Sequence, residues 1–201
     1  IMVDFPIPIV VVSSMEVEVV IKALGMGAMD FVAVDRPRDE IAKDLLTKVK
    51  IASKVRPLRR MQIKPRCNSI ASAESKLKVV AIGASTGGPQ ALHAVLSKLP
   101  ADFGAPIVIV QHMSQGFIHG FVEWLKMNCV LEIKVASCGD VLRKGVVFIA
   151  PDEYHLRIDN SGKIQLFQDL DKKHYHVPSI DIMMETVASV YGPLGLAILL
   201  T

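Results

Sequence analysis

The stretch KVVAIGASTGGP, residues 78–89, is an apolar run that ends in a glycine-rich turn. The run from Lys78 to Ile82 has no polar alternation, which is typical of a strand covered on both faces. Pro89 follows the turn at a position that suits the first turn of a helix. The buried stripe of that helix comprises Leu92, Val95, Leu96 and Leu99. The stretch therefore predicts a strand, a sharp turn and a helix, the repeating unit of a parallel sheet.

The same alternation continues on the C-terminal side of this unit. Strands are predicted at residues 105–111, 131–135 and 195–200, and a helix at 117–126. Ser179 can cap a further helix, whose apolar stripe is Ile180, Met183, Met184, Val187 and Val190. Strands that alternate with helices of this length predict an α/β fold with a doubly wound parallel sheet over residues 77–201.

Residues 145–168 depart from this alternation. Three short strands are predicted at 146–149, 154–158 and 163–167, and Asn160-Ser161-Gly162 supplies the residues of a tight hairpin turn. We expect all three strands to form a small antiparallel hairpin insert.

Residues 1–50 form a shorter α/β piece. Strands are predicted at residues 7–12 and 30–34, with helices around the stripes Val17, Val20, Ile21, Leu24 and Ile41, Leu45, Val49. Gly25 and Gly27 are expected to end the first helix. Residues 51–76 show no sustained period and contain Pro57 and Pro65, so we interpret them as a basic linker. The predicted organisation is thus 1–50, the linker 51–76 and a main domain 77–201.

Composition narrows the class of protein. The chain has 201 residues, a net charge of +3, 51% hydrophobic residues and a mean hydropathy of +0.39, which is typical of a folded protein. No apolar run reaches the roughly 18–20 residues of a membrane span, and the start lacks both an initiator Met and the features of a signal peptide. Three cysteines (Cys67, Cys129, Cys138) without a C-x-x-C pair indicate reduced thiols and a cytoplasmic location.

Much of the positive charge is concentrated in eight Lys and Arg residues between Lys43 and Lys64. A solvated basic linker and a phosphate or nucleic-acid patch are the two interpretations. No aromatic side chain interleaves these charges, which argues against binding of single strands. We expect no nucleic-acid partner.

The turn Gly83-Ala84-Ser85-Thr86-Gly87 fits G-x-S-x-G, with a strand before it and a helix after it. A nucleophile on a sharp turn needs neighbours without Cβ clashes, and a helix N-terminus favours developing negative charge. Ser85 is therefore a candidate nucleophile. An anion-binding glycine loop and a purely structural turn are the alternatives.

A serine nucleophile requires a base within hydrogen-bond reach. His112 directly follows the predicted strand 105–111, 27 residues after Ser85. Residues just past two parallel strands lie at the same sheet edge, so His112 is the candidate base and a structural His the alternative. His93 and His119 fall inside predicted helices as packing or surface residues. His174 and His176 are interpreted as solvated loop residues, the alternative being a metal pair that no Cys or carboxylate cluster completes.

The chain resembles the chemotaxis protein-glutamate methylesterase (CheB) family. The resemblance rests on residues 82–89, Gln111-His112-Met113, Gly116-Phe117, Ile149-Ala150-Pro151, Pro178-Ser179-Ile180-Asp181 and residues 198–201, and residues 9–14 and 23–32 resemble half of that family's receiver domain. It implies a cytoplasmic response regulator that hydrolyses glutamate methyl esters on chemoreceptor helices, deamidates glutamines, needs no cofactor and is controlled through its receiver by the chemotaxis histidine kinase.

The resemblance also implies site roles. Ser85 matches the family's nucleophile and His112 its base, while Gly83, Thr86, Gly87 and Gly88 form the supporting turn. Ser13 matches the receiver's phosphate-sensing hydroxyl. The usual receiver Lys is Val34 here, and the usual His-Arg-Pro-Ser is His176-Val177-Pro178-Ser179.

The resemblance places the family's catalytic Asp and part of its oxyanion hole after Thr201, and the phospho-accepting Asp before Ile1. On that basis we expect a fragment with trace esterase activity, unless Asp140, Asp152 or Asp181 substitutes for the acid. A non-catalytic regulatory or receptor-binding fragment with an anion-binding turn is the alternative function.

Overall fold

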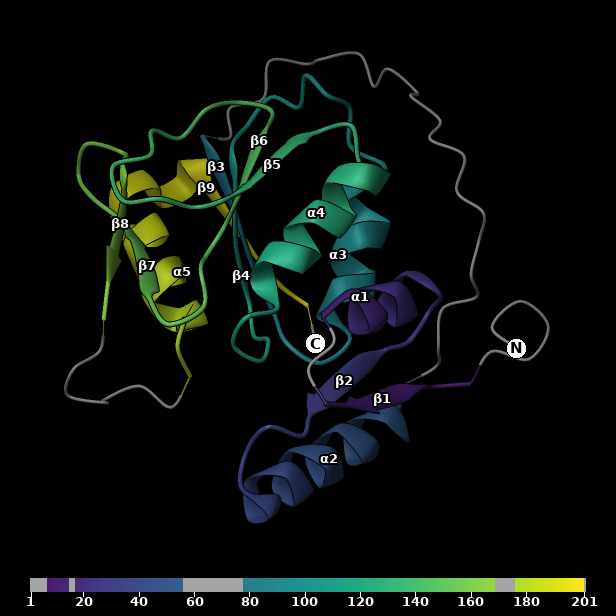
Figure 1. Cartoon of the computed structure of the whole chain (residues 1–201). Helices are drawn as coiled ribbons and strands as arrows, with labels where there is room; N and C mark the ends of the chain where they lie inside the picture. The colour runs from purple at the N-terminus through teal and green to yellow at the C-terminus, as the bar shows by residue number, and fades with distance from the viewer. Residues whose placement is uncertain (1–6, 15–16, 56–77, 169–175, 201) are drawn as a thin grey trace.

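A computed structural model describes residues 7–14, 17–55, 78–168 and 176–200 (Figure 1). The predicted linker 51–76 lies largely outside these residues, as do Cys67 and His174. No helix in the described ranges is long and apolar enough to cross a bilayer.

The centre of the molecule is a five-stranded parallel sheet in the order β5-β6-β4-β3-β9. Its strands are β3 (Val79–Ala84), β4 (Ile107–Gln111), β5 (Glu132–Val135), β6 (Val146–Ile149) and β9 (Gly195–Leu200). Every residue of β3, β4 and β6 is buried, as expected for strands covered on both faces. The prediction of a mostly parallel α/β sheet is confirmed.

Two layers cover this sheet (Figure 1). Helices α3 (Gly88–Leu96) and α4 (Ile118–Asn128) pack on the face that presents Ile82 and Ile109. Helix α5 (Ile180–Tyr191) and the antiparallel hairpin of β7 (His155–Ile158) and β8 (Ile164–Phe167) pack on the face that presents Ala81 and Val108. A short 3-10 helix, η1 (Gly192–Leu194), leads from α5 into β9.

The predicted hairpin insert is partly wrong. The segment β7–β8 is antiparallel as expected, but Val146–Ile149 is β6, which pairs in parallel with both β4 and β5. The reason is visible in its residues, because Val-Val-Phe-Ile is apolar on both faces and needs cover on both. A half-exposed hairpin strand would alternate with polar residues instead.

The N-terminal part is a β-α-β-α segment. Strands β1 (Val10–Ser13) and β2 (Asp30–Ala33) pair in parallel, α1 (Val17–Gly25) connects them, and α2 (Arg38–Ala52) follows. The first strand begins three residues later than predicted, and α2 continues two residues past the expected boundary at residue 50.

This N-terminal part shares a hydrophobic core with the main domain. Leu24 of α1 and Phe31 of β2 belong to the same buried cluster as Ile82 and Phe121. The ring of Phe31 lies against the ring of Phe117, with centroids 4.3 Å apart. Figure 1 shows α1 lying beside α3 and α4.

Candidate active site

Ser85 and His112 lie at the same edge of the sheet. Strands β3 and β4 are in register to their last residues, with Ala84 opposite Gln111. The backbone N–H of His112 donates to the Ala84 carbonyl at 2.9 Å, which extends the ladder one step further. The two residues therefore begin the two neighbouring loops at the carboxyl ends of their strands, where sites form in parallel sheets.

The turn that carries Ser85 is tight. The Gly88 N–H donates to the Ser85 carbonyl at 2.8 Å, and Gly87 has a φ of +77°, a left-handed conformation that favours glycine. Gly87 is the N-cap of α3 and provides no side-chain cap. The N-terminus of α3, with its partial positive charge, therefore lies at the serine turn.

The remaining predicted turn residues surround this point. Gly83 lies in β3, where the side chain of Ile180 from α5 occupies the space next to its Cα. The Thr86 hydroxyl forms a hydrogen bond with the Asp30 carboxyl of the N-terminal part. Gly88 lies against the Gln111 side chain. The serine turn thus contacts three other elements: α5, β2 and β4.

The His112 imidazole is half-buried and has two close neighbours. Its Nε2 lies 3.1 Å from the Pro178 carbonyl, and its ring stacks on the His176 ring with centroids 4.5 Å apart and an interplanar angle of 29°. Because a carbonyl can only accept, Nε2 is the donor, and the lone pair of the neutral ring is on Nδ1. Burial and the neighbouring His176 lower the pKa of His112, while the Pro178 hydrogen bond and the charge of Asp181 partly oppose this.

His176 is an exposed loop residue, as expected, but its ring also stacks on the His112 ring. His176 lies against His112 because the segment ending in Pro178 and Ser179 is fixed at its C-terminal end. The Ser179 hydroxyl caps α5 by accepting from Ile182, and the Ser179 N–H donates to Nδ1 of the buried His155 at 3.0 Å. The sequence signal for this placement is Ser179, because a serine that caps α5 fixes the position of the residues just before it, His176 included.

His93 is a packing residue and His119 a surface residue. The His93 ring lies against Trp124, with centroids 4.9 Å apart, and burial lowers the pKa of His93. His119 lies in α4, in the electrostatic field of Asp152. Within the described ranges, no group of three or more His, Cys, Asp or Glu side chains could hold a metal ion.

Asp140, Asp152 and Asp181 are the three candidates for an orienting acid. Asp140 pairs with Lys134 at 2.8 Å, and Asp152 accepts from the Gly116 N–H at 2.7 Å. Asp181 is the one whose charge acts on His112, by raising its pKa. In the described part of the chain, no carboxylate is hydrogen-bonded to the His112 ring.

Sequence reasoning missed Gln111. This residue is 2% exposed, and its Nε2 donates to the Ser85 carbonyl and to the His112 carbonyl, each at 2.9 Å. Its amide oxygen is buried and has no hydrogen-bond partner among the described residues. The signal was a polar side chain at the last position of an otherwise apolar, buried strand.

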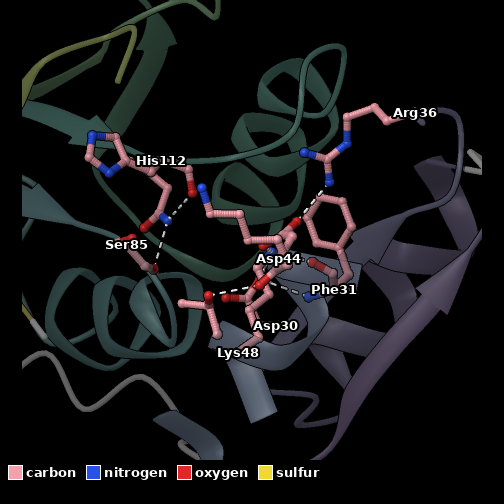
Figure 2. Close-up of polar contacts among 10 residues, drawn as sticks. Asp30, Phe31, Arg36, Asp44, Lys48, Ser85 and His112 are labelled. Atoms are coloured by element: carbon pink, nitrogen blue, oxygen red, sulfur yellow. Dashed lines mark hydrogen bonds and ion pairs between the residues drawn. The ribbon is translucent and has the colours of Figure 1, made fainter. Parts of the chain in front are cut away.

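The N-terminal part contributes a charged cluster next to the turn. The Lys48 ammonium contacts the Asp30 carboxylate at 3.2 Å and Asp44 at 3.6 Å, and it also donates to the Phe31 carbonyl (Figure 2). Burial raises the pKa of Asp30, with Lys48 opposing that shift. Lys48 is therefore paired rather than a free cation of a basic linker.

Ser13 lies away from this cluster, at the end of β1. Its carbonyl accepts from the Val34 N–H at 3.0 Å. Ser13 and Val34 are thus neighbours at the point where the β1–β2 pair ends.

Known proteins resemble the chain over most of its length. A family model described as CheB methylesterase matches residues 80–201. A protein-glutamate methylesterase/protein-glutamine glutaminase of Nitrosospira multiformis is 38% identical over 98% of this chain and 60% of its own length. A protein of that name from Syntrophus aciditrophicus is 38% identical over all of this chain and 62% of its own length. The chain thus spans about three fifths of these curated relatives.

A solved structure gives the same result for the fold. The catalytic domain of the Thermotoga maritima CheB methylesterase superposes with a TM-score of 0.58 at 37% identity. The superposition covers 62% of this chain and 67% of that domain.

Proposed function

Since the chain belongs to the CheB methylesterase family, we propose that it is a protein-glutamate methylesterase that hydrolyses glutamyl methyl esters on chemoreceptors and deamidates receptor glutamines. Ser85 is the nucleophile and His112 the general base. The observation that carries this proposal is the parallel pairing of β3 with β4, because it places Ser85 and His112 at the same edge of the sheet. The Gln111 amide, which donates to the carbonyls of both residues, also joins the two loops there.

The proposed chemistry is acyl transfer in two steps. Nδ1 of neutral His112 takes the proton of the Ser85 hydroxyl as Oγ attacks the ester carbonyl, and the protonated His112 returns the proton to the methoxide, so methanol leaves. Water then attacks the acyl-enzyme, with His112 again acting as the base. The N-terminus of α3 beside Ser85 favours the negative charge that develops in both steps.

The direct test is product release. The protein is incubated with a chemoreceptor peptide that carries a glutamyl methyl ester, and methanol is measured over time. The matching glutamine peptide, assayed for ammonia, tests the deamidase activity. Methanol release no faster than the uncatalysed reaction, by a protein that is folded by circular dichroism, would refute the esterase.

We also infer that residues 1–50 are the C-terminal half of a receiver domain, with the chemotaxis histidine kinase as its partner. The parallel β1–β2 pair connected by α1, and the adjacency of Ser13 and Val34, support this. The match to the Syntrophus aciditrophicus relative, which extends over the whole chain, also supports it.

The pH dependence of the esterase should depend on the two charged neighbours of His112. As His112 must be neutral to act as a base, kcat/KM should rise with pH through a midpoint below the ordinary histidine value of about 6.5. His176→Gln removes a like charge, so the pKa of His112 rises and the midpoint moves up. Asp181→Asn removes an opposite charge, so the pKa falls and the midpoint moves down.

The measurement is a pH profile of kcat/KM for each variant, with His119→Gln as the control. His119 lies in α4 and is not among the groups that shift the pKa of His112. The pH profile of His119→Gln should therefore match that of the unchanged protein. Shifts of the same sign in the His176 and Asp181 variants would contradict the assignment of the midpoint to His112.

A further inference from the structure

The Gln111 side chain bridges the two residues of the proposed catalytic pair. One nitrogen, Nε2, donates to the carbonyls of Ser85 and His112, at 2.9 Å to each. The β3–β4 ladder runs to the Ala84–Gln111 pair and is extended by the His112 N–H, after which the two chains diverge. The Gln111 amide thus joins them at the point where backbone pairing ends.

The orientation of this amide follows from its surroundings. Both neighbours are carbonyl oxygens, which can only accept, so the NH₂ group and not the amide oxygen must face them. An apolar side chain or a carboxylate of the same size would leave both carbonyls without this donor. A side-chain amide as long as that of glutamine is therefore suited to position 111, because it can donate to both carbonyls.

The other end of the Gln111 side chain lies beside Gly88. Its Oε1 is buried without a hydrogen-bond partner in the described part of the chain, and a buried unpaired acceptor destabilises the folded state. Gly88 leaves the space in which this oxygen lies, because a Cβ on Gly88 would collide with it. The glycine at position 88 therefore leaves room for the orientation of the Gln111 side chain in which its NH₂ group lies between the two carbonyls.

We propose that Gln111 is a positioning residue that sets the separation of the Ser85 and His112 backbones, and so the approach of the base to the nucleophile. This inference rests on the proposed function, because it assigns Gln111 a role in the same reaction. Gln111 acts only through the carbonyls of the pair. A displacement of about 1 Å between reacting groups reduces rates on the order of 100-fold.

The test compares two glutamines of similar chemistry. Gln111→Met keeps the size of the side chain and removes the bridge. Gln90→Met is the matched control, because the Gln90 amide also donates to two backbone carbonyls, those of Leu24 and Ala28, neither of which belongs to the pair. Each protein is reacted with a serine-directed fluorophosphonate, and kcat and KM are measured with the methyl ester peptide at a temperature well below unfolding.

We expect Gln111→Met to label about 10- to 100-fold more slowly and to lose kcat to the same extent with KM unchanged. Gln90→Met should label at the rate of the unchanged protein, although both variants melt at a lower temperature. If Gln111→Met does not fold, Gln111→Asn keeps an amide that is too short to span both carbonyls, and the same loss is expected.

Three outcomes separate the possibilities. Labelling of the Gln111 variant at the unchanged rate would overturn the positioning role, as would an equal loss in the Gln90 variant, which would indicate general loosening. Absence of labelling and of methanol release in the unchanged protein would instead overturn the proposed function.

Discussion

Ser85→Ala should eliminate the reaction with a serine-directed fluorophosphonate and reduce methanol release from a glutamyl methyl ester on the order of 100-fold. This is the part of the roughly 10⁶-fold effect of a serine nucleophile that remains when no carboxylate is hydrogen-bonded to the base, as in the described part of this site. The physical reason is that alanine has no atom to form the acyl-enzyme. Ser85 lies in the turn between the buried strand β3 and helix α3, and alanine fits that turn. The free energy of unfolding should therefore change little.

The matched control for this prediction is Ser97→Ala at the other end of α3. Ser97 follows the last residue of α3, so Ser97→Ala makes the same chemical change at the end of the helix that lies away from the serine turn. It should leave labelling and methanol release unchanged. Labelling that persists in Ser85→Ala would identify another nucleophile and would remove Ser85 from the mechanism.

Phe31→Ala should destabilise the whole chain by about 3–5 kcal/mol, the usual range for a buried phenylalanine. Phe31 is 2% exposed and packs on Phe117, so its removal leaves a cavity between the N-terminal part and the main domain. At about 2–4 °C per kcal/mol for a chain of this size, the melting temperature should fall by about 6–20 °C.

The measurement uses the single tryptophan of the chain as a local probe. Trp124 borders the end of α1, since its Nε1 lies 2.9 Å from where a Cβ on Gly25 would stand. Because the two parts share one core, the unfolding curves from Trp124 fluorescence and from far-UV circular dichroism should coincide. Met127→Ala, on the exposed side of α4, is the control and should shift stability by less than about 0.5 kcal/mol.

An earlier transition in fluorescence than in circular dichroism would contradict the shared core. It would show that the N-terminal part detaches before the sheet unfolds. A Met127 variant as unstable as the Phe31 variant would show that the helix, and not the contact between the two parts, was disturbed.

The sheet could be predicted because its strands have a strong local signal. Runs such as Ile107 to Val110 are apolar at every position, which only a strand covered on both faces tolerates, and glycine, proline and serine mark the turns between elements. The prediction for Val146–Ile149 is wrong because the segment lies next to a hairpin in sequence, although its residues lack the alternation of a half-exposed strand.

The placement of Ser85 and His112 could be predicted because parallel strands put their C-terminal ends at one edge. The partners of His112 could not. The stacking of His176 depends on how a loop 64 residues further along the chain returns to the sheet, and no local pattern encodes that return. The bridge from Gln111 to the carbonyls of Ser85 and His112 likewise depends on how the loops after β3 and β4 diverge, which residue spacing does not encode.

The core shared by the N-terminal part and the main domain also determines what happens when the backbone is cleaved between them. A backbone break between Val55 and Lys78 would separate the chain into two pieces at a boundary that the sequence suggests. The buried cluster crosses that boundary, and Gln90 donates to carbonyls of Leu24 and Ala28 on the other side of it. The two pieces would therefore remain associated as a noncovalent complex, so a nicked protein would run as two bands in denaturing gels and as one species in gel filtration.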